Sequence, residues 1–178
     1  MVLVDNNILS SLAKVGRLDL LKELFGEVMT TPSVMEEFRD ERIEGYDFVD
    51  RIYDARTFGE VTEDKWLQLT SLSNQENQAK EEVLGRGGPL GVADSECLVI
   101  ADNRDEVLLT DDTYLGSRAM SEDIDVYDLE TLLEACIRDG VIEDSEELKE
   151  ILEGIENRDY YSFAPGFKEK LLSVLEEK

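Results

Sequence analysis

The sequence predicts an α/β fold in which helices cover both faces of a central, mostly parallel sheet, giving three layers. Short runs of apolar and β-branched residues alternate with segments of helical apolar spacing throughout residues 1–128. Strands separated by helices form βαβ units, whose strands run parallel and are buried on both faces. Residues 129–178 show helical spacing only, so we expect a helical extension packed on the same domain.

Five short strands are expected, each a brief apolar run. They are Val2–Val4, Glu27–Thr30, Glu60–Thr62, Val107–Thr110 and Ile124–Val126. The helical segments between them are 8–15, 18–25, 31–38, 46–53, 64–84 (as one or two helices), 91–103 and 112–120. Pro32 suits the first turn of the third segment, and the run Gly85–Pro89 is the clearest break in the chain.

The charge is the unusual feature of the composition. The 178 residues include 43 acidic and 18 basic side chains, which give a formal net charge of -25. The acids are scattered along an ordered-looking chain and form no acidic tail, so the composition resembles that of proteins from halophilic archaea, whose cells hold near-saturated salt. At about 1 M salt the Debye length is only about 3 Å, so this charge does not exclude a nucleic-acid partner.

The sequence shows no targeting or membrane segment. Met1 leads directly into an expected strand, and the longest apolar stretch, Cys97–Ala101, is too short to cross a bilayer. Cys97 and Cys136 form no CxxC pair and lie in apolar helical segments, as buried free thiols do. We therefore expect a cytoplasmic protein with no membrane partner.

Acidic residues recur at four comparable positions. Asp5 follows the first strand, and the pair Asp111–Asp112 follows the strand that begins at Val107. Glu36 and Glu37 lie in the first turn after the second strand, and Asp94 and Glu96 lie at the start of the helix expected from Gly91. Each acid alone could simply cap a helix or complement its dipole.

Together these acids indicate a metal site. The carboxyl ends of parallel strands and the helix starts beside them share one edge of the sheet, where such folds place their sites. Converging carboxylates repel one another unless a cation neutralises them, and oxygen-only ligation suits Mg²⁺ or Mn²⁺. The chain has no histidine, which excludes histidine acid–base catalysis. Metal-assisted hydrolysis of a phosphodiester is the chemistry that remains.

The ordered segments VLVDNN, PSVMEEF, LGVADSECLVIA and LLTDDTYLGSRA resemble a PIN domain over roughly residues 1–128. The tail resembles that of a prokaryotic subgroup. PIN domains are Mg²⁺- or Mn²⁺-dependent ribonucleases, and the VapC-type toxins are their best-known branch. The resemblance thus implies RNA as the substrate, an antitoxin protein as a candidate partner and a homodimer as the expected assembly.

The same resemblance assigns roles to individual residues. The catalytic acids would be Asp5, Glu37, Asp94 and Asp112. The metal ligands would be Asp5, Asp94, Asp111 and Asp112. The supporting groups would be Asn7, Thr110 and Glu96. Two departures are mild, since Asn6 stands where Thr or Ser is commoner and Asp94 where this subgroup often has Glu.

Two choices between neighbouring acids rest on spacing. Ser33 and Glu36 have the spacing of a capping box, which leaves Glu37 as the ligand. The T-x-D spacing favours Asp112, with Asp111 as a second ligand or an orienting group.

Other interpretations remain open. A phosphoacceptor receiver domain needs a lysine after its fifth strand, and none lies between Lys80 and Lys149. A haloacid-dehalogenase-type phosphatase needs DxD where this chain has Asp5-Asn6-Asn7. The serious alternative is a non-catalytic module, PIN-like in fold, that binds nucleic acid or protein and whose acids only cap helices and confer salt tolerance.

Phosphate and base contacts are less defined by the sequence. Arg86, beside the glycine run, and Arg118, near the last acidic motif, are candidates for nucleic-acid binding, although Arg118 fits an ordinary surface arginine equally well. Four aromatic residues are expected to pack in the core or the tail instead of stacking on bases. They are Trp66, Tyr160, Tyr161 and Phe163.

Overall fold

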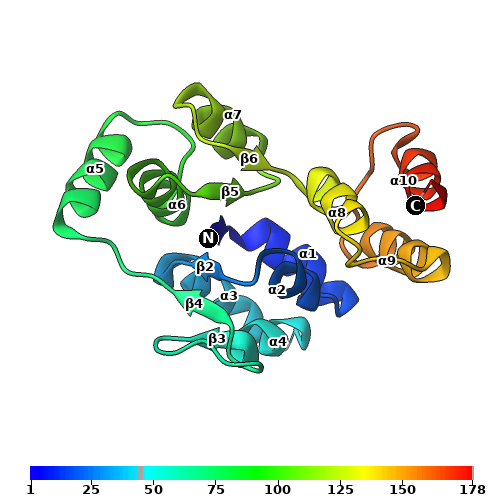
Figure 1. Cartoon of the computed structure of the whole chain (residues 1–178). Helices are drawn as coiled ribbons and strands as arrows, with labels where there is room; N and C mark the ends of the chain where they lie inside the picture. The colour runs from blue at the N-terminus through cyan, green and yellow to red at the C-terminus, as the bar shows by residue number, and fades with distance from the viewer. Residues whose placement is uncertain (44–45, 178) are drawn as a thin grey trace.

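Six parallel strands form one sheet in the order β3-β4-β2-β1-β5-β6. This computed structural model describes residues 1–43 and 46–177, apart from the side chains of residues 40–43. The strands are β1 (Val2–Val4), β2 (Val28–Thr30), β3 (Arg56–Thr57), β4 (Leu67–Leu69), β5 (Val107–Leu109) and β6 (Val126–Tyr127). With helices on both faces, the sheet forms the predicted three-layer α/β/α fold (Figure 1).

Ten helices lie within the described ranges. The first seven are α1 (Asn6–Val15), α2 (Asp19–Phe25), α3 (Pro32–Ile43), α4 (Phe48–Ala55), α5 (Asn74–Gly85), α6 (Val92–Arg104) and α7 (Thr113–Ser121). The last three form the end of the chain and are α8 (Leu129–Arg138), α9 (Ser145–Arg158) and α10 (Phe167–Glu176). None of the described helices is long and apolar enough to span a bilayer.

The segment between α4 and α5 differs from the prediction. No strand forms at Glu60–Thr62, whose residues are exposed, and β4 interrupts the region 64–84 that was expected to be helical. The buried side chains Trp66 and Leu67 explain this result, because they place β4 beside β2, where Leu67 pairs with Val28. Two or three residues are too few to show a period in the sequence.

The register of the central strands brings the carboxyl ends of β1 and β5 together at one edge of the sheet, which we call the functional edge. Val4 at the end of β1 pairs with Leu109 at the end of β5, and the backbone N–H of Asp5 donates to the carbonyl of Leu109 over 3.1 Å. Asp5 and Thr110 therefore leave the sheet side by side. Both strands are buried on both faces, as expected for a parallel sheet.

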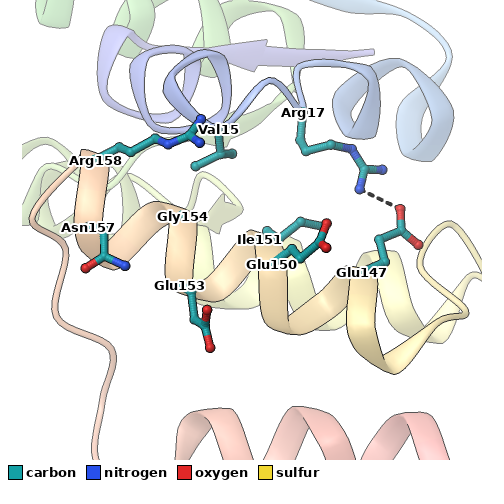
Figure 2. A pocket seen from close by; sticks show the side chains of 9 residues that line it. All are labelled: Val15, Arg17, Glu147, Glu150, Ile151, Glu153, Gly154, Asn157 and Arg158. Atoms are coloured by element: carbon teal, nitrogen blue, oxygen red, sulfur yellow. Dashed lines mark hydrogen bonds and ion pairs between the residues drawn. The ribbon is translucent and has the colours of Figure 1, made fainter.

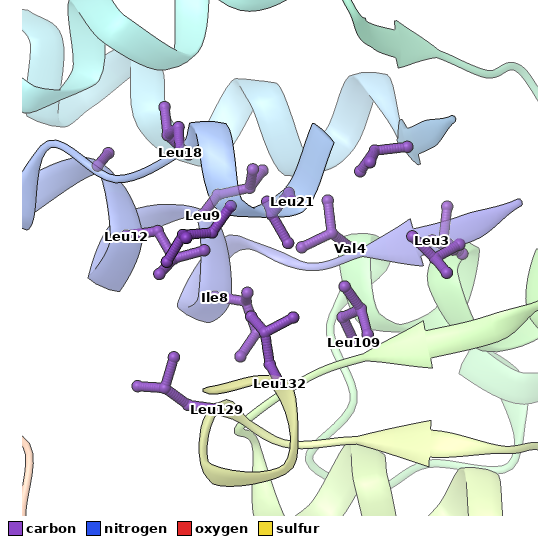
Figure 3. Packing of buried hydrophobic residues seen from close by; sticks show 14 of the residues in the cluster. Leu3, Val4, Ile8, Leu9, Leu12, Leu18, Leu21, Leu109, Leu129 and Leu132 are labelled. Carbon is purple, nitrogen blue, oxygen red and sulfur yellow. The ribbon is translucent and has the colours of Figure 1, made fainter. Parts of the chain in front are cut away.

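One hydrophobic cluster joins the sheet to the C-terminal helices. Figure 3 shows Ile8 of α1 between Leu109 of β5 and Leu129 and Leu132 of α8, with Leu12 further along α1. Burying these side chains from three elements together stabilises the fold through the hydrophobic effect.

The chain end also packs directly on α1, the helix that follows Asp5. α9 lies against α1, and α10 contacts both α8 and α9 (Figure 1). Figure 2 shows Arg17 paired with Glu147 at 2.5 Å, and Val15 facing Gly154 of α9. The final helices therefore help to hold α1 in place.

Candidate active site

The two carboxylate oxygens of Asp5 accept hydrogen bonds from different partners. Its Oδ1 caps α1 by accepting from the N–H groups of Asn7 and Ile8, at 2.9 and 3.4 Å, and its Oδ2 accepts a hydrogen bond from the hydroxyl of Thr110. The residue is only 3% exposed. Burial above all, with a smaller contribution from the charge of Asp94, raises its pKa from 3.8 to about 7. A carboxylate here is thus costly without a cation.

Asp5 and three further acids lie close enough to the buried Cys97 to affect its thiol. Burial and, in decreasing order, the charges of Asp5, Asp94, Glu96 and Glu37 raise the pKa of the Cys97 thiol. The amide of Asn6, next to Asp5, donates to Oε2 of Glu37 on α3. The structure therefore brings Asp5, Glu37 and Asp94 to one region, as the sequence predicts.

Asp94 and Asp112 also accept backbone N–H groups at the N-termini of helices. Oδ2 of Asp94 accepts from the N–H of Gly91 at 2.9 Å, and Oδ1 of Asp112 accepts from the N–H of Leu115 at 2.7 Å. Thr110 links Asp112 to Asp5, since its hydroxyl oxygen accepts from the N–H of Asp112 at 3.1 Å while donating to Asp5. Capping fixes the direction of each acid without using both of its oxygens.

Asp111 faces a different part of the molecule from Asp5. Its Oδ1 accepts from the N–H of Leu129 at 3.3 Å and from the hydroxyl of Tyr161 at 3.5 Å. Burial, chiefly, raises its pKa. Asp111 thus connects the functional edge to α8 and to the segment after α9.

The predicted capping box at Ser33 and Glu36 is wrong. The hydroxyl of Thr31 accepts from the N–H of Val34 at 3.2 Å, because Pro32 is already the first residue of α3. Glu36 instead pairs with Arg39 at 2.8 Å on the exposed side of the helix. Capping therefore does not distinguish Glu37 from Glu36, but the contact of Glu37 with Asn6 brings it close to Asp5.

The remaining candidates separate by their partners. Glu96 is buried, with Oε1 3.7 Å from Nζ of Lys80. Arg118 pairs with Glu122 of its own helix at 2.5 Å, as an ordinary surface arginine does. Arg86 is exposed at the end of α5. Asn7 contributes its backbone to the Asp5 cap.

A cavity of about 680 Å³ opens beside Asp111 and Asp112 and reveals residues that the sequence did not single out. It is lined by polar residues of α1, by Phe38 and by Tyr114. Lys14 and Asp159 also line it, and they pair with each other at 2.6 Å. Asp159 comes from the end of α9, so only the tertiary packing could have identified it.

The aromatic residues also differ in part from the prediction. Trp66 is buried, and Tyr161 packs against Phe163 with a ring separation of 4.9 Å. Tyr160, however, is 89% exposed and packs in neither core nor tail, so that prediction is wrong. Its backbone adopts a positive φ of 55° in the segment after α9.

The family model for the PIN domain matches residues 1–177. The chain belongs to the PIN-domain family. The match continues through the C-terminal helices, beyond the 1–128 over which the sequence motifs show the resemblance. Comparisons with curated proteins and with solved structures find no match. PIN domains are commonly nucleases, and such nucleases generally use divalent metals.

The donor chemistry of this PIN domain fits a hard divalent cation. Asp5, Glu37, Asp94 and Glu96 supply only oxygen ligands, and Glu96 Oε2 is buried without a hydrogen-bond partner in the part of the chain described. Among the side chains of residues 1–39 and 46–177, no three acidic or cysteine groups are arranged so that they could hold one ion. The charge and chemistry thus fit, while Asp5 and Asp94 are oriented by their helix caps.

Proposed function

We propose that this PIN domain is an endoribonuclease that hydrolyses phosphodiester bonds of RNA with Mg²⁺ or Mn²⁺. The observation that supports it most is Asp5, a buried acid with a pKa of about 7 at the sheet edge where acids of α3 and α6 meet. A helix cap alone does not need a buried acid with a second acid, Asp94, near it. The alternative, a non-catalytic binding module, leaves this arrangement without a purpose.

The residues have distinct roles in this proposal. Asp5, Asp94 and Asp112 would hold the cation, with Asp111 as a further candidate ligand. The bound ion would stabilise negative charge on the phosphate and favour attack by water. Thr110 orients Asp5 and Asp112 together, and Asn6 orients Glu37. Glu37, which is exposed, would then accept a proton from water.

A cleavage assay tests this function. Purified protein in concentrated KCl should cut single-stranded RNA with Mn²⁺ or Mg²⁺, and EDTA should abolish cleavage. Glu37→Gln should reduce the rate by about 100-fold or more, whereas Glu36→Gln, one residue away but paired with Arg39, should not. Cleavage that persists after EDTA and dialysis would overturn the metal mechanism, and a complete lack of cleavage would favour the binding module.

The cellular role is a finer part of the proposal. A VapC-like toxin would be inhibited by a small antitoxin protein. The antitoxin gene would overlap or adjoin the gene of the toxin. Expression of the neighbouring gene product with this chain should block cleavage in the same assay. Cleavage that is unaffected by the neighbour would favour a role in RNA maturation or quality control.

A further inference from the structure

Arg86 is an exception among the basic residues of this chain. Of the arginine and lysine side chains that the structure describes, it alone has no ion pair, hydrogen bond or ring contact. The chain carries 43 acidic residues, so an arginine or lysine side chain readily finds a carboxylate with which to form an ion pair. An exposed guanidinium left free in such a protein is therefore available for an external anion.

The loop that carries Arg86 leads to the proposed active site. Gly88 has a φ of +133°, and a Cβ built on it would lie 3.3 Å from the hydroxyl of Tyr114. Three residues later, the N–H of Gly91 holds Asp94. The loop thus runs from a free cation, past a tyrosine, to one of the proposed metal ligands.

Tyr114 is positioned to receive a base. It follows Asp112 by two residues, lines the 680 Å³ cavity and is 47% exposed, and no hydrogen bond to its hydroxyl holds it in the described structure. An aromatic ring beside a cation is the usual combination with which proteins bind single-stranded nucleic acid. Arg118, the other arginine of this region, is neutralised by Glu122.

We propose that Tyr114 stacks on a base of single-stranded RNA next to the cleaved phosphate, while Arg86 binds a phosphate of the same strand. This assignment deepens the proposed nuclease function and rests on it. A duplex would be a poor ligand, because its bases are paired and stacked and cannot lie on the tyrosine ring. Gly88 lets the loop approach Tyr114 without a side chain between them.

Binding without cleavage provides the test. Fluorescence anisotropy with a labelled single-stranded oligoribonucleotide in EDTA gives Kd for the wild type, Tyr114→Ser, Tyr114→Phe and Arg86→Gln. We expect Tyr114→Ser to weaken binding about tenfold and Tyr114→Phe to bind as wild type, because stacking needs the ring and not the hydroxyl. The controls are Tyr160→Ser, which removes an exposed tyrosine elsewhere, and Arg118→Gln, which removes a paired arginine.

Salt separates the two contributions. The effect of Arg86→Gln should shrink as KCl is raised, because phosphate binding releases counterions, while the effect of Tyr114→Ser should persist. Unchanged Kd values for Arg86→Gln and Tyr114→Ser, or equal binding of duplex RNA, would overturn this inference. Metal-dependent cleavage by the wild type would still support the nuclease function in that case, whereas its absence would reject the function itself.

Discussion

At the scale of single residues, Asp5 shows that capping and metal binding are compatible in one side chain. Its Oδ1 satisfies backbone N–H groups at the start of α1, yet its burial and raised pKa are not needed for a cap. Asp94 and Asp112 likewise each use one carboxylate oxygen to accept a backbone N–H at the start of a helix. Helix starts at the sheet edge therefore aim acids at a common region and fix their rotamers.

Asp5→Asn should separate the two roles. Asparagine caps as well as aspartate, so the free energy of unfolding of the metal-free protein should stay level or rise as a buried charge is removed. Metal-induced stabilisation should disappear and cleavage should fall by about 100-fold or more. Thermal melting with and without Mn²⁺, beside the cleavage assay, measures both effects.

Asp5→Ala is the matched comparison. It removes the cap as well, so it should lower stability by about 1 kcal/mol. An asparagine variant that keeps its metal-induced stabilisation and its activity would mean that Asp5 is only a helix cap.

The proposed ligands were within reach of sequence analysis because they occupy element boundaries. Asp5, Asp94 and Asp112 follow strands or begin helices, and local patterns show such positions. Tyr114 and Asp159 were missed, since their place at the cavity depends on packing between segments distant in the chain. Asp159, for example, meets Lys14 of α1 across 145 positions of sequence.

At the scale of elements, an ion pair between the buried Glu76 and the partly exposed Arg104 joins α5 to α6. Both carboxylate oxygens of Glu76 accept from Arg104, at 2.6 and 2.9 Å, and Glu76 also closes a capping box with Ser73. Hydrogen bonds from Arg104 come first among the causes that lower the Glu76 pKa from 4.5 to about 2. The ionised form is therefore the one that the folded state favours.

Glu76→Gln should expose this contribution through its pH dependence. Glutamine still suits the capping box, so the decrease in the free energy of unfolding at pH 7, about 1–3 kcal/mol, measures the contribution of the Glu76 charge. A lowered folded pKa gives a stabilisation that is complete above the ordinary value of 4.5 and is lost as the pH falls towards 2.

Urea denaturation of the wild type and of Glu76→Gln between pH 7 and pH 3 should show the difference between their free energies of unfolding narrowing below pH 4.5. Glu81→Gln is the control, because Glu81 is exposed on the same helix and its contact with Lys80, at 3.8 Å, is long for an ion pair. A difference that is constant with pH would mean that the ion pair adds no stability.

The contact between α1 and α9 offers a second prediction for elements. A Cβ on Gly154 would lie 2.9 Å from Cγ1 of Val15, a β-branched side chain with little freedom to move (Figure 2). Gly154→Ala should therefore destabilise the protein, by up to about 2 kcal/mol, despite the better helix propensity of alanine.

In a Val15→Ala background the sign should reverse. The obstacle is gone there, so the same Gly154→Ala change should stabilise by about 1 kcal/mol. A double-mutant cycle from denaturant unfolding measures both steps. Equal effects in the two backgrounds would show that α9 can shift away from α1 at little cost.

Elements were predictable where their pattern is long enough to repeat. α1, α6 and the strands β1, β2 and β5 follow from apolar runs and helical spacing. β3 and β4 do not, because they contain two or three residues and Gln68 interrupts the apolar run of β4. Their places are set by pairing with β2 and with each other, which no local pattern records.

At the scale of the whole molecule, the negative charge must act against the fold. Apart from Arg86, the described bases are engaged by acids, backbone carbonyls or aromatic rings, and the excess of acids leaves a net charge of -25. Mutual repulsion among surface carboxylates destabilises the compact state unless ions screen it. The halophilic origin that the composition suggests is therefore a proposal with a measurable consequence.

Thermal melting followed by circular dichroism should show the melting temperature falling steadily as KCl is lowered from about 2 M to about 50 mM, where the Debye length exceeds 10 Å. The control replaces KCl by glycine betaine, which is excluded from protein surfaces but has no net charge to screen carboxylates. Betaine should restore less stability than KCl at equal osmolality, because repulsion among the carboxylates persists. A protein equally stable at both salt concentrations would show that this surface is not adapted to salt. The nuclease proposal would be unaffected, because the proposed active-site acids lie at the sheet edge and act locally.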